Sequence, residues 1–190
     1  MASNKMFSKI NESLSGNRDQ QSFFLLMDDI ENDSIRPCIE WIIDSNFSEE
    51  PAEMLNLMIC SSGGDLNAGF ALIDVIRGSH IPVRTIGIGQ IASAGLMIFM
   101  AGYHGHRILT PNTAILSHQY SWGSVGKSHE LIAATKAFDL TSTMLMNHYK
   151  KCSNLDEDQI NKLLLPPHDV WLSPAEALDY GLCDEIKDLN

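Results

Sequence analysis

Positive charge is scarce in this sequence, and no apolar run is long enough to cross a bilayer. Its 13 Lys and Arg residues stand against 24 Asp and Glu residues, which gives a formal net charge of -11. A chain this acidic is a poor partner for nucleic-acid phosphates or anionic lipid. The longest apolar run, residues 91–101, has about half the length that spans a membrane. We therefore expect neither nucleic-acid binding nor membrane insertion.

Secretion signals and a disulfide framework are also lacking. Residues 1–21 are polar and contain no apolar segment of the kind that directs secretion. The four cysteines form no CxxC pair, so we expect them to be reduced and mostly buried. They are Cys38, Cys60, Cys152 and Cys183. These features favour a cytoplasmic protein.

Length and composition favour a single globular domain. The chain has 190 residues, of which 44% are hydrophobic and 19% are charged, and this is enough for one sizeable core. We expect residues 1–21 to form a mobile leader and residues 22–190 to form one domain.

Short apolar runs alternate with helical patterns along that domain. Strands are predicted over residues 23–27, 55–60, 82–88, 107–109 and 114–117. Helices are predicted from Asn32 or Asp33 onward, over residues 66–76, 92–100 and 128–151, and from Ser153 or Asn154 onward. Strands separated by helices in this order indicate parallel βαβ units, and hence an α/β fold.

The last helix has the clearest start signal. Ser173 is a good N-cap residue, with Pro174 at the first helical position and Glu176 at the third. Gly181 is placed to end the helix. We therefore expect a short helix between Ser173 and Gly181.

Ser93 is the strongest candidate nucleophile. It lies in a stretch of small residues, 89–95, at the first turn of a predicted apolar helix. Unpaired backbone N–H groups at such a turn can bind an oxyanion, and the N–H of Ala94 would be one donor. The stretch is not a G-x-S-x-G elbow, because Ile91 holds the first glycine position. The alternative is that Ser93 only caps the helix.

A pair of glycines follows the second predicted strand, in the sequence Ser61-Ser62-Gly63-Gly64. Glycine lets a backbone approach a ligand closely and turn an N–H toward it. The pair would supply a second oxyanion donor, or it would only form a tight turn between strand and helix.

His118 is the best placed of the seven histidines to act as a base. It ends a predicted apolar strand, a common position for catalytic groups, although a purely structural role is equally open. His104 and His106 lie in a predicted loop, and the sequence shows no third ligand for a metal. His129 and His148 lie on the long predicted helix, where we expect both to be solvated.

Asp169 is the candidate for an acid that orients a catalytic histidine. It lies between Pro166-Pro167 and the apolar pair Val170-Trp171. We expect a carboxylate in that setting to be partly buried and to have a partner. The alternative is an ordinary aspartate of a surface turn.

Four motifs together resemble the family of Clp protease proteolytic subunits, over roughly residues 23–187. They are the glycine pair after a strand, the A-S-x-G helix start, the His-Gln pair at a strand end and the ending D-x-x-L-S-x-x-E-A-x-x-Y-G-L-x-D. The ending runs here from Asp169 to Asp184. Candidate triad residues in the order Ser, His, Asp also differ from the Ser, Asp, His order of α/β-hydrolases.

The resemblance implies a serine endopeptidase with a crotonase-like superhelix of βαβ units. In the family pattern Ser93 matches the nucleophile, His118 the general base and Asp169 the acid that orients it. Gly63 and Ala94 match the backbone oxyanion donors.

Substrate binding and assembly are implied by the same resemblance. Unfolded polypeptides would bind by main-chain hydrogen bonds beside a strand at residues 122–128. The predicted substrate-binding residues are Gly64, Gln119, Tyr120 and Ser121. The helix over residues 128–151 would join heptameric rings around a degradation chamber. A partner AAA+ unfoldase would use ATP, whereas this chain would need no cofactor or metal of its own.

The sequence also departs from the family pattern. Ser62 stands where the family has a proline, and Pro167-His168 replaces an Asp-Arg pair that helps rings sense one another. Two other functions are open: a non-catalytic ring subunit beside an active paralogue, and a crotonase-type acyl-CoA enzyme. The first is disfavoured because all three triad positions are filled, and the second would need no Ser-His-Asp set.

Overall fold

The computed structural model describes residues 21–189, which form one seven-stranded sheet with helices packed on it. Its main path runs in the order β1 (Gln21–Leu26), β2 (Met54–Ser61), β3 (Val83–Ala92), β4 (Arg107–Leu109) and β7 (Glu185–Ile186). These strands pair in parallel, and β5 (Ala114–Ser117) also pairs in parallel with β3. Among the strands of the described residues, only β6 (Val170–Leu172) runs antiparallel, against β5. The expected α/β fold with parallel βαβ units is confirmed.

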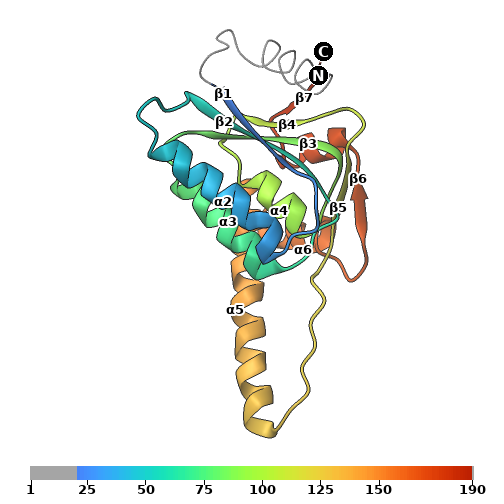
Figure 1. Ribbon diagram of the computed structural model, residues 1–190. Helices are drawn as coiled ribbons and strands as arrows, with labels where there is room; N and C mark the ends of the chain where they lie inside the picture. Colours follow the sequence, from blue (N-terminus) through green and yellow to red (C-terminus); the bar gives the residue numbers. More distant parts are fainter. Residues whose placement is uncertain (1–20, 190) are drawn as a thin grey trace.

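Helices connect the strands of the described chain. They are α2 (Asn32–Asn46), α3 (Leu66–Gly78), α4 (Ala94–Met100), α5 (Ser128–Cys152), α6 (Glu157–Leu163) and α7 (Pro174–Asp179). Figure 1 shows α2, α3 and α4 together on one face of the sheet, while α5 extends away from it as a long arm. Strand residues are also buried away from the main core, in a smaller cluster formed by Met58, Ile86 and Ile108.

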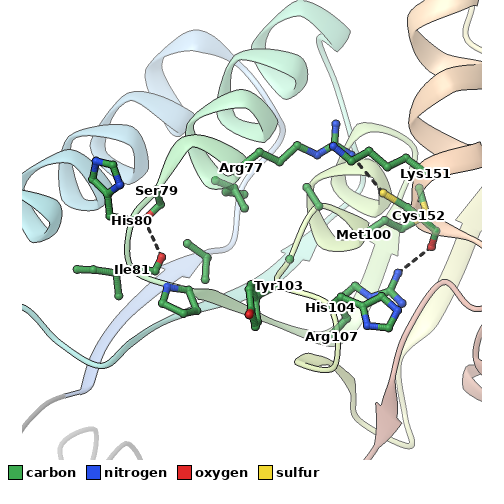
Figure 2. Close-up of a pocket in the computed structure, with 15 residues that line it drawn as sticks. Arg77, Ser79, His80, Ile81, Met100, Tyr103, His104, Arg107, Lys151 and Cys152 are labelled. Carbon is green, nitrogen blue, oxygen red and sulfur yellow. Dashed lines mark hydrogen bonds between the residues drawn. The ribbon is translucent and has the colours of Figure 1, made fainter.

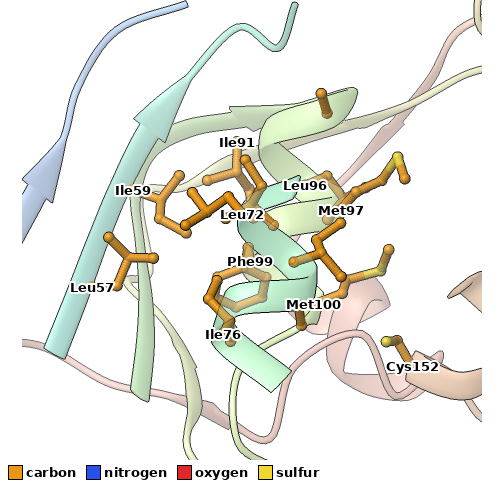
Figure 3. Packing of buried hydrophobic residues seen from close by; sticks show 14 of the residues in the cluster. Leu57, Ile59, Leu72, Ile76, Ile91, Leu96, Met97, Phe99, Met100 and Cys152 are labelled. Carbon is orange, nitrogen blue, oxygen red and sulfur yellow. The ribbon is translucent and has the colours of Figure 1, made fainter. Parts of the chain in front are cut away.

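The main core lies between the sheet and the helices α3 and α4 (Figure 3). Ile59 of β2, Leu72 of α3 and Phe99 of α4 are fully buried there. Burying a large apolar side chain contributes about 1.5–3 kcal/mol relative to leaving it exposed. All seven residues of α4 are buried, so this short helix is held from every side.

Strand β3 is longer than the sequence predicted. It was expected to end at residue 88, but it continues to Ala92 and passes through Gly89 at a φ of 62°, which glycine tolerates. The register with β2 shifts between Ile59 and Ser61 opposite this point. The continuation pairs Gln90–Ala92 with β5, and it carries the chain directly to Ser93.

Helices α3 and α5 begin where the sequence predicted, whereas α4 begins at Ala94 instead of residue 92 because β3 continues to Ala92. Of the other predicted starts, two differ from the structure and one is confirmed. Helix α2 is capped by Glu31, not by Asn32 or Asp33, because the Glu31 N–H donates to Ser34 Oγ at 3.0 Å. Helix α6 begins later than expected, after Asp156. The cap at Ser173 is confirmed, since the Glu176 N–H donates to Ser173 Oγ and the Ser173 N–H donates to the Glu176 carboxylate.

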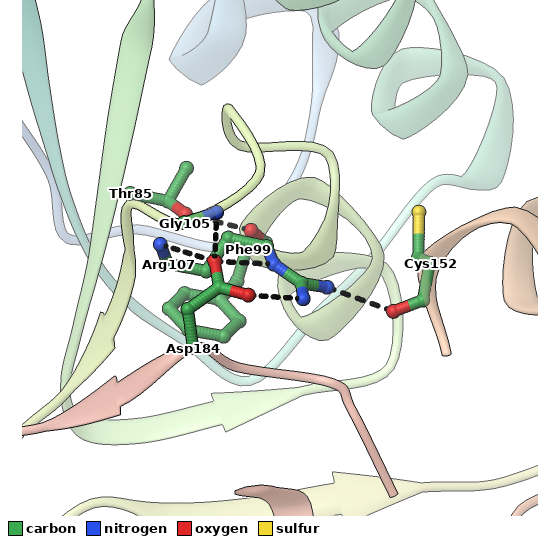
Figure 4. A network of polar contacts seen from close by, with 6 residues as sticks. All are labelled: Thr85, Phe99, Gly105, Arg107, Cys152 and Asp184. Carbon is green, nitrogen blue, oxygen red and sulfur yellow. Dashed lines mark hydrogen bonds and ion pairs between the residues drawn. The ribbon is translucent and has the colours of Figure 1, made fainter. Parts of the chain in front are cut away.

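A buried ion pair fastens the C-terminal segment to the sheet (Figure 4). Arg107 Nη2 donates to Asp184 Oδ1 at 2.6 Å, and Arg107 Nε donates to Asp184 Oδ2 at 2.9 Å. Burial raises the pKa of Asp184, but the hydrogen bonds from Arg107 outweigh burial and leave that pKa below its ordinary value. Arg107 Nη1 also donates to the Cys152 carbonyl at 2.7 Å, which ties down the end of α5.

The predictions about cysteines, membrane spans and the N-terminal leader have different outcomes. The cysteines of the described residues are free, and only Cys60 is partly exposed, as predicted. Within the same residues no helix is long and apolar enough to span a membrane. The expected leader lies outside the described residues, except for Gln21, which belongs to β1.

Candidate active site

Ser93 is held in an unusual backbone conformation where β3 meets α4. Its φ of 53° is the only positive value of a non-glycine residue in the described chain, and its ψ is -123°. A residue other than glycine in such a region costs about 1–3 kcal/mol. Its backbone N–H donates to the Leu116 carbonyl at 3.0 Å, which fixes the turn to β5.

The side chain of Ser93 is not used as a helix cap. Ser93 occupies the N-cap position of α4, yet its Oγ makes no capping hydrogen bond. A serine that only capped the helix would accept a bond from a backbone N–H of the first turn. The hydroxyl is therefore left available for other chemistry.

The glycine pair lies directly against Ser93. Gly63 has a φ of 100°, and a Cβ built on it would lie 2.6 Å from Ser93 Cβ and 3.2 Å from the Ala94 nitrogen. Only glycine permits so close an approach of the two backbones. The Gly63 N–H donates to Ser61 Oγ at 3.2 Å, whereas the Gly64 N–H has no partner within the described residues.

His118 and Asp169 lie together at the end of the sheet. His118 Nδ1 is 3.6 Å from Asp169 Oδ1, a distance for an ion pair rather than a hydrogen bond. The Asp169 side chain is 62% exposed, so the expectation that it is partly buried was wrong. It directly precedes β6, which pairs only with β5, and the carboxylate therefore opens to solvent.

Ser93 and His118 face one cleft of about 570 Å³. In the described part of the chain, no hydrogen bond joins their side chains. Catalytic hydrogen bonds are often long before substrate binds, so the Ser-His-Asp triad remains a prediction that this arrangement is compatible with.

Comparison with known proteins shows the family of the chain. A family model described as Clp protease matches residues 17–190. The chain belongs to the Clp protease family. The ATP-dependent Clp protease proteolytic subunits of Deinococcus radiodurans and Paracoccus denitrificans are each 34% identical to it. The alignments cover 74% of this chain and 68% of the first relative, and 73% and 69% for the second.

Similarity of fold to a solved structure is also found. A ClpP1 mutant from Listeria monocytogenes superimposes with a TM-score of 0.76 at 23% identity, covering 99% of this chain and 96% of the other. The crotonase-like fold and the Clp-type serine peptidase family expected from the sequence are confirmed. Neither the non-catalytic nor the acyl-CoA alternative is favoured.

Aromatic side chains form one wall of this Clp-family cleft. Trp122 and Phe138 pack with ring centroids 5.0 Å apart, and Tyr120 packs on Phe138 at 5.6 Å. Tyr120 Oη also shares a hydrogen bond with Ser142 Oγ at 3.1 Å. The wall is apolar, and the hydrogen bond to Ser142 holds Tyr120 in place, so the wall can contact an apolar side chain of a peptide. The sequence pattern placed Phe138 near an apolar face of the long helix that a ring contact would bury, and did not assign it to the substrate cleft.

Three of the predicted substrate-binding residues line the cleft and one does not. Gly64, Tyr120 and Ser121 contribute to it. The Gln119 side chain turns away, because its Nε2 donates to the Leu165 carbonyl at 2.8 Å. Residues 122–127 are irregular in the described chain, so the strand expected at 122–128 is absent from the single subunit.

His148 differs most from its prediction. It was expected to be solvated, but it is 3% exposed, and its ring contacts both α3 and α4. The buried residues of α5 are Leu145, His148, Tyr149 and Cys152, a spacing that marks one face of a helix. That spacing is the sequence signal that could have placed His148 in the core.

A metal centre finds no support in the described residues. No group of three or more His, Cys, Asp or Glu side chains there is arranged to hold an ion.

Proposed function

We propose that this chain is the proteolytic subunit of a Clp-type protease and cleaves unfolded polypeptides with Ser93 as nucleophile. The observation that carries the proposal is the Ser93 turn. The residue is held at a positive φ, leaves its Oγ uncapped and shares a cleft with His118. Strained residues persist where the surrounding structure over-determines them, and they cluster at active sites.

The residues divide the chemistry as in other serine peptidases. Ser93 Oγ attacks the carbonyl carbon of the scissile bond while His118 takes its proton. His118 then gives this proton to the leaving amine, and water hydrolyses the acyl-enzyme in a second step. Asp169 orients His118, and their 3.6 Å separation shortens to a hydrogen bond when substrate and neighbouring subunits close the site.

The oxyanion of the tetrahedral intermediate needs two backbone donors. Ala94 supplies one, since its N–H begins α4 beside Ser93. We assign the second to Gly64 rather than to Gly63, because the Gly63 N–H already donates to Ser61 Oγ. Gly63 then serves as the residue without a Cβ that lets the loop approach Ser93.

Assembly completes the proposed function. The arm α5 exposes Leu131, Ile132, Leu140 and Met144 to solvent, and a second subunit would bury such an apolar face. Subunits forming heptameric rings would enclose the clefts in a chamber, with ATP used by a partner AAA+ unfoldase. We propose a cytoplasmic location for this assembly.

Labelling with a fluorophosphonate tests the proposal. The probe should modify Ser93 of the wild type, as located by mass spectrometry, and should leave Ser93→Ala unlabelled. Ser93→Ala, His118→Ala and Asp169→Asn should each remove most peptide cleavage, with strongly non-additive losses in double variants. Ser48→Ala, at an exposed loop serine, is the control that keeps both labelling and cleavage. Near-normal cleavage by Ser93→Ala would overturn the proposal.

A further inference from the structure

A chain of polar contacts crosses the core from α3 through α5 to α4. Arg77 Nη2 of α3 lies 2.9 Å from His148 Nδ1 of α5, and His148 Nε2 lies 2.9 Å from the Met97 carbonyl of α4. Figure 2 shows Arg77 reaching toward the end of α5, where it also donates to Cys152 Sγ at 3.3 Å. The three helices that surround the active site thus meet at one buried imidazole.

The direction of these bonds follows from chemistry. A guanidinium can only donate, so His148 Nδ1 must accept from Arg77 and the ring proton must lie on Nε2. Nε2 therefore donates to the Met97 carbonyl. Burial, with the charge of Arg77 as the second cause, lowers the pKa of His148 to about 4, which keeps the ring neutral and this arrangement intact at neutral pH.

The Met97 carbonyl of α4 depends on a hydrogen-bond donor from outside the helix. It ends in a tight turn in which the Ala101 N–H donates to the Ile98 carbonyl at 3.1 Å. In a continuing α-helix that N–H would have bonded the Met97 carbonyl. His148 Nε2 supplies this donor to the Met97 carbonyl. Another carbonyl near the end of α4, that of Phe99, likewise accepts from a side chain outside the helix, Thr85 Oγ1, at 2.8 Å.

Met97 is directly coupled to the nucleophile. The Met97 N–H donates to the Ser93 carbonyl at 3.2 Å, so the peptide held by His148 lies one helical turn beyond Ser93. A strained residue keeps its conformation only when its surroundings leave no alternative. At Ser93 these surroundings are the Gly63 backbone, the Leu116 carbonyl and α4.

We propose that His148, aligned by Arg77, is a positioning residue for Ser93. It holds α4 against α5 and so keeps the nucleophile in its strained, reactive conformation. Arg77 lies in the last turn of α3, so the same contact ties the C-terminal end of α3 to α5. The inference rests on the proposed peptidase function.

Variants at the imidazole test this role. His148→Leu removes both hydrogen bonds, whereas His148→Gln can still donate to Met97 and accept from Arg77. We expect His148→Leu to lower kcat and the rate of Ser93 labelling by about tenfold to a hundredfold, with KM changed less than about twofold. His148→Gln should recover most of both rates. Arg77→Met provides a second route to misalignment if His148→Leu fails to fold.

A matched control separates positioning from loss of stability. Trp41→Phe removes a partly buried hydrogen bond, from Nε1 to Ser22 Oγ at 2.7 Å, in a part of the fold away from Ser93. Its kcat should equal that of the wild type even where its midpoint of urea unfolding falls. Wild-type kcat and labelling in the folded Leu or Met variant would overturn the inference and leave the peptidase intact. Absence of labelling in the wild type would instead reject the peptidase function.

Discussion

Acid should destabilise this protein through His148. Burial, followed by the charge of Arg77, lowers the pKa of this residue from 6.5 to about 4, and Lys151 adds to the effect. The hydrogen bond to the Met97 carbonyl opposes it. Because the folded state holds the neutral ring, the stabilisation is fully present above the unfolded-state pKa. It is lost as pH falls from 6.5 toward about 4.

The magnitude follows from the same values. A fall in pKa from 6.5 to about 4 corresponds to roughly 3 kcal/mol of unfolding free energy. This is a large share of the free energy of unfolding of a typical domain, which is roughly 5–15 kcal/mol. The other titratable groups against the ring are Cys152 and Tyr149, and burial raises the pKa of both, so they stay neutral over this range.

Urea unfolding of the wild type and of His148→Gln, at fixed salt, isolates this contribution. The stability difference between the two proteins should change by roughly 2–3 kcal/mol between about pH 7 and pH 4.5, in favour of the variant at low pH. Carboxylates that titrate in the same range are common to both proteins and cancel. Parallel pH profiles would refute the reasoning, because they would mean that His148 is as easily protonated in the folded state as in the unfolded one.

Two further substitutions test the site and the fold. Gly63→Ala should cost about 2 kcal/mol or more and remove most activity, because its Cβ would meet Ser93 at a positive φ. Gly78→Ala, where a Cβ meets no atom within 4 Å, should lower neither stability nor activity in the same urea and peptidase assays. Asp184→Ala should lower stability by about 3–5 kcal/mol, since Arg107 is left buried without its partner. Glu157→Gln breaks an exposed pair and should cost less than about 1 kcal/mol; equal losses in these two variants would contradict the argument.

Local patterns were sufficient to predict most elements of the fold. The alternation of strands and helices indicated parallel βαβ units, and the Ser173 capping box fixed the start of α7. These features depend on neighbours a few residues apart, which a sequence displays directly. The triad candidates were also predicted from local positions, at a strand end and at a helix start.

The features that the sequence did not reveal depend on contacts between residues far apart along the chain. A glycine such as Gly89 is typical of the end of a strand, yet pairing with β5 extends β3 beyond this residue. The partners of His148 lie 71 and 51 residues away along the chain, so only the fold reveals them. The apolar neighbours of Asp169 predicted partial burial, but the single pairing of β6 leaves its side chain exposed.

The backbone of Ser93 offers a test that separates stability from activity. Its φ of 53° costs about 1–3 kcal/mol, which Ser93→Gly would relieve, while the added freedom of the unfolded chain costs about 0.5–1 kcal/mol. We expect Ser93→Gly to be more stable than the wild type by about 1 kcal/mol in urea unfolding, and to be inactive. Ser93→Ala keeps the Cβ and the strain, so it is the matched control, inactive but of wild-type stability. If Ser93→Gly were no more stable than Ser93→Ala, the turn would not be strained, and the conformation of Ser93 would no longer point to catalysis.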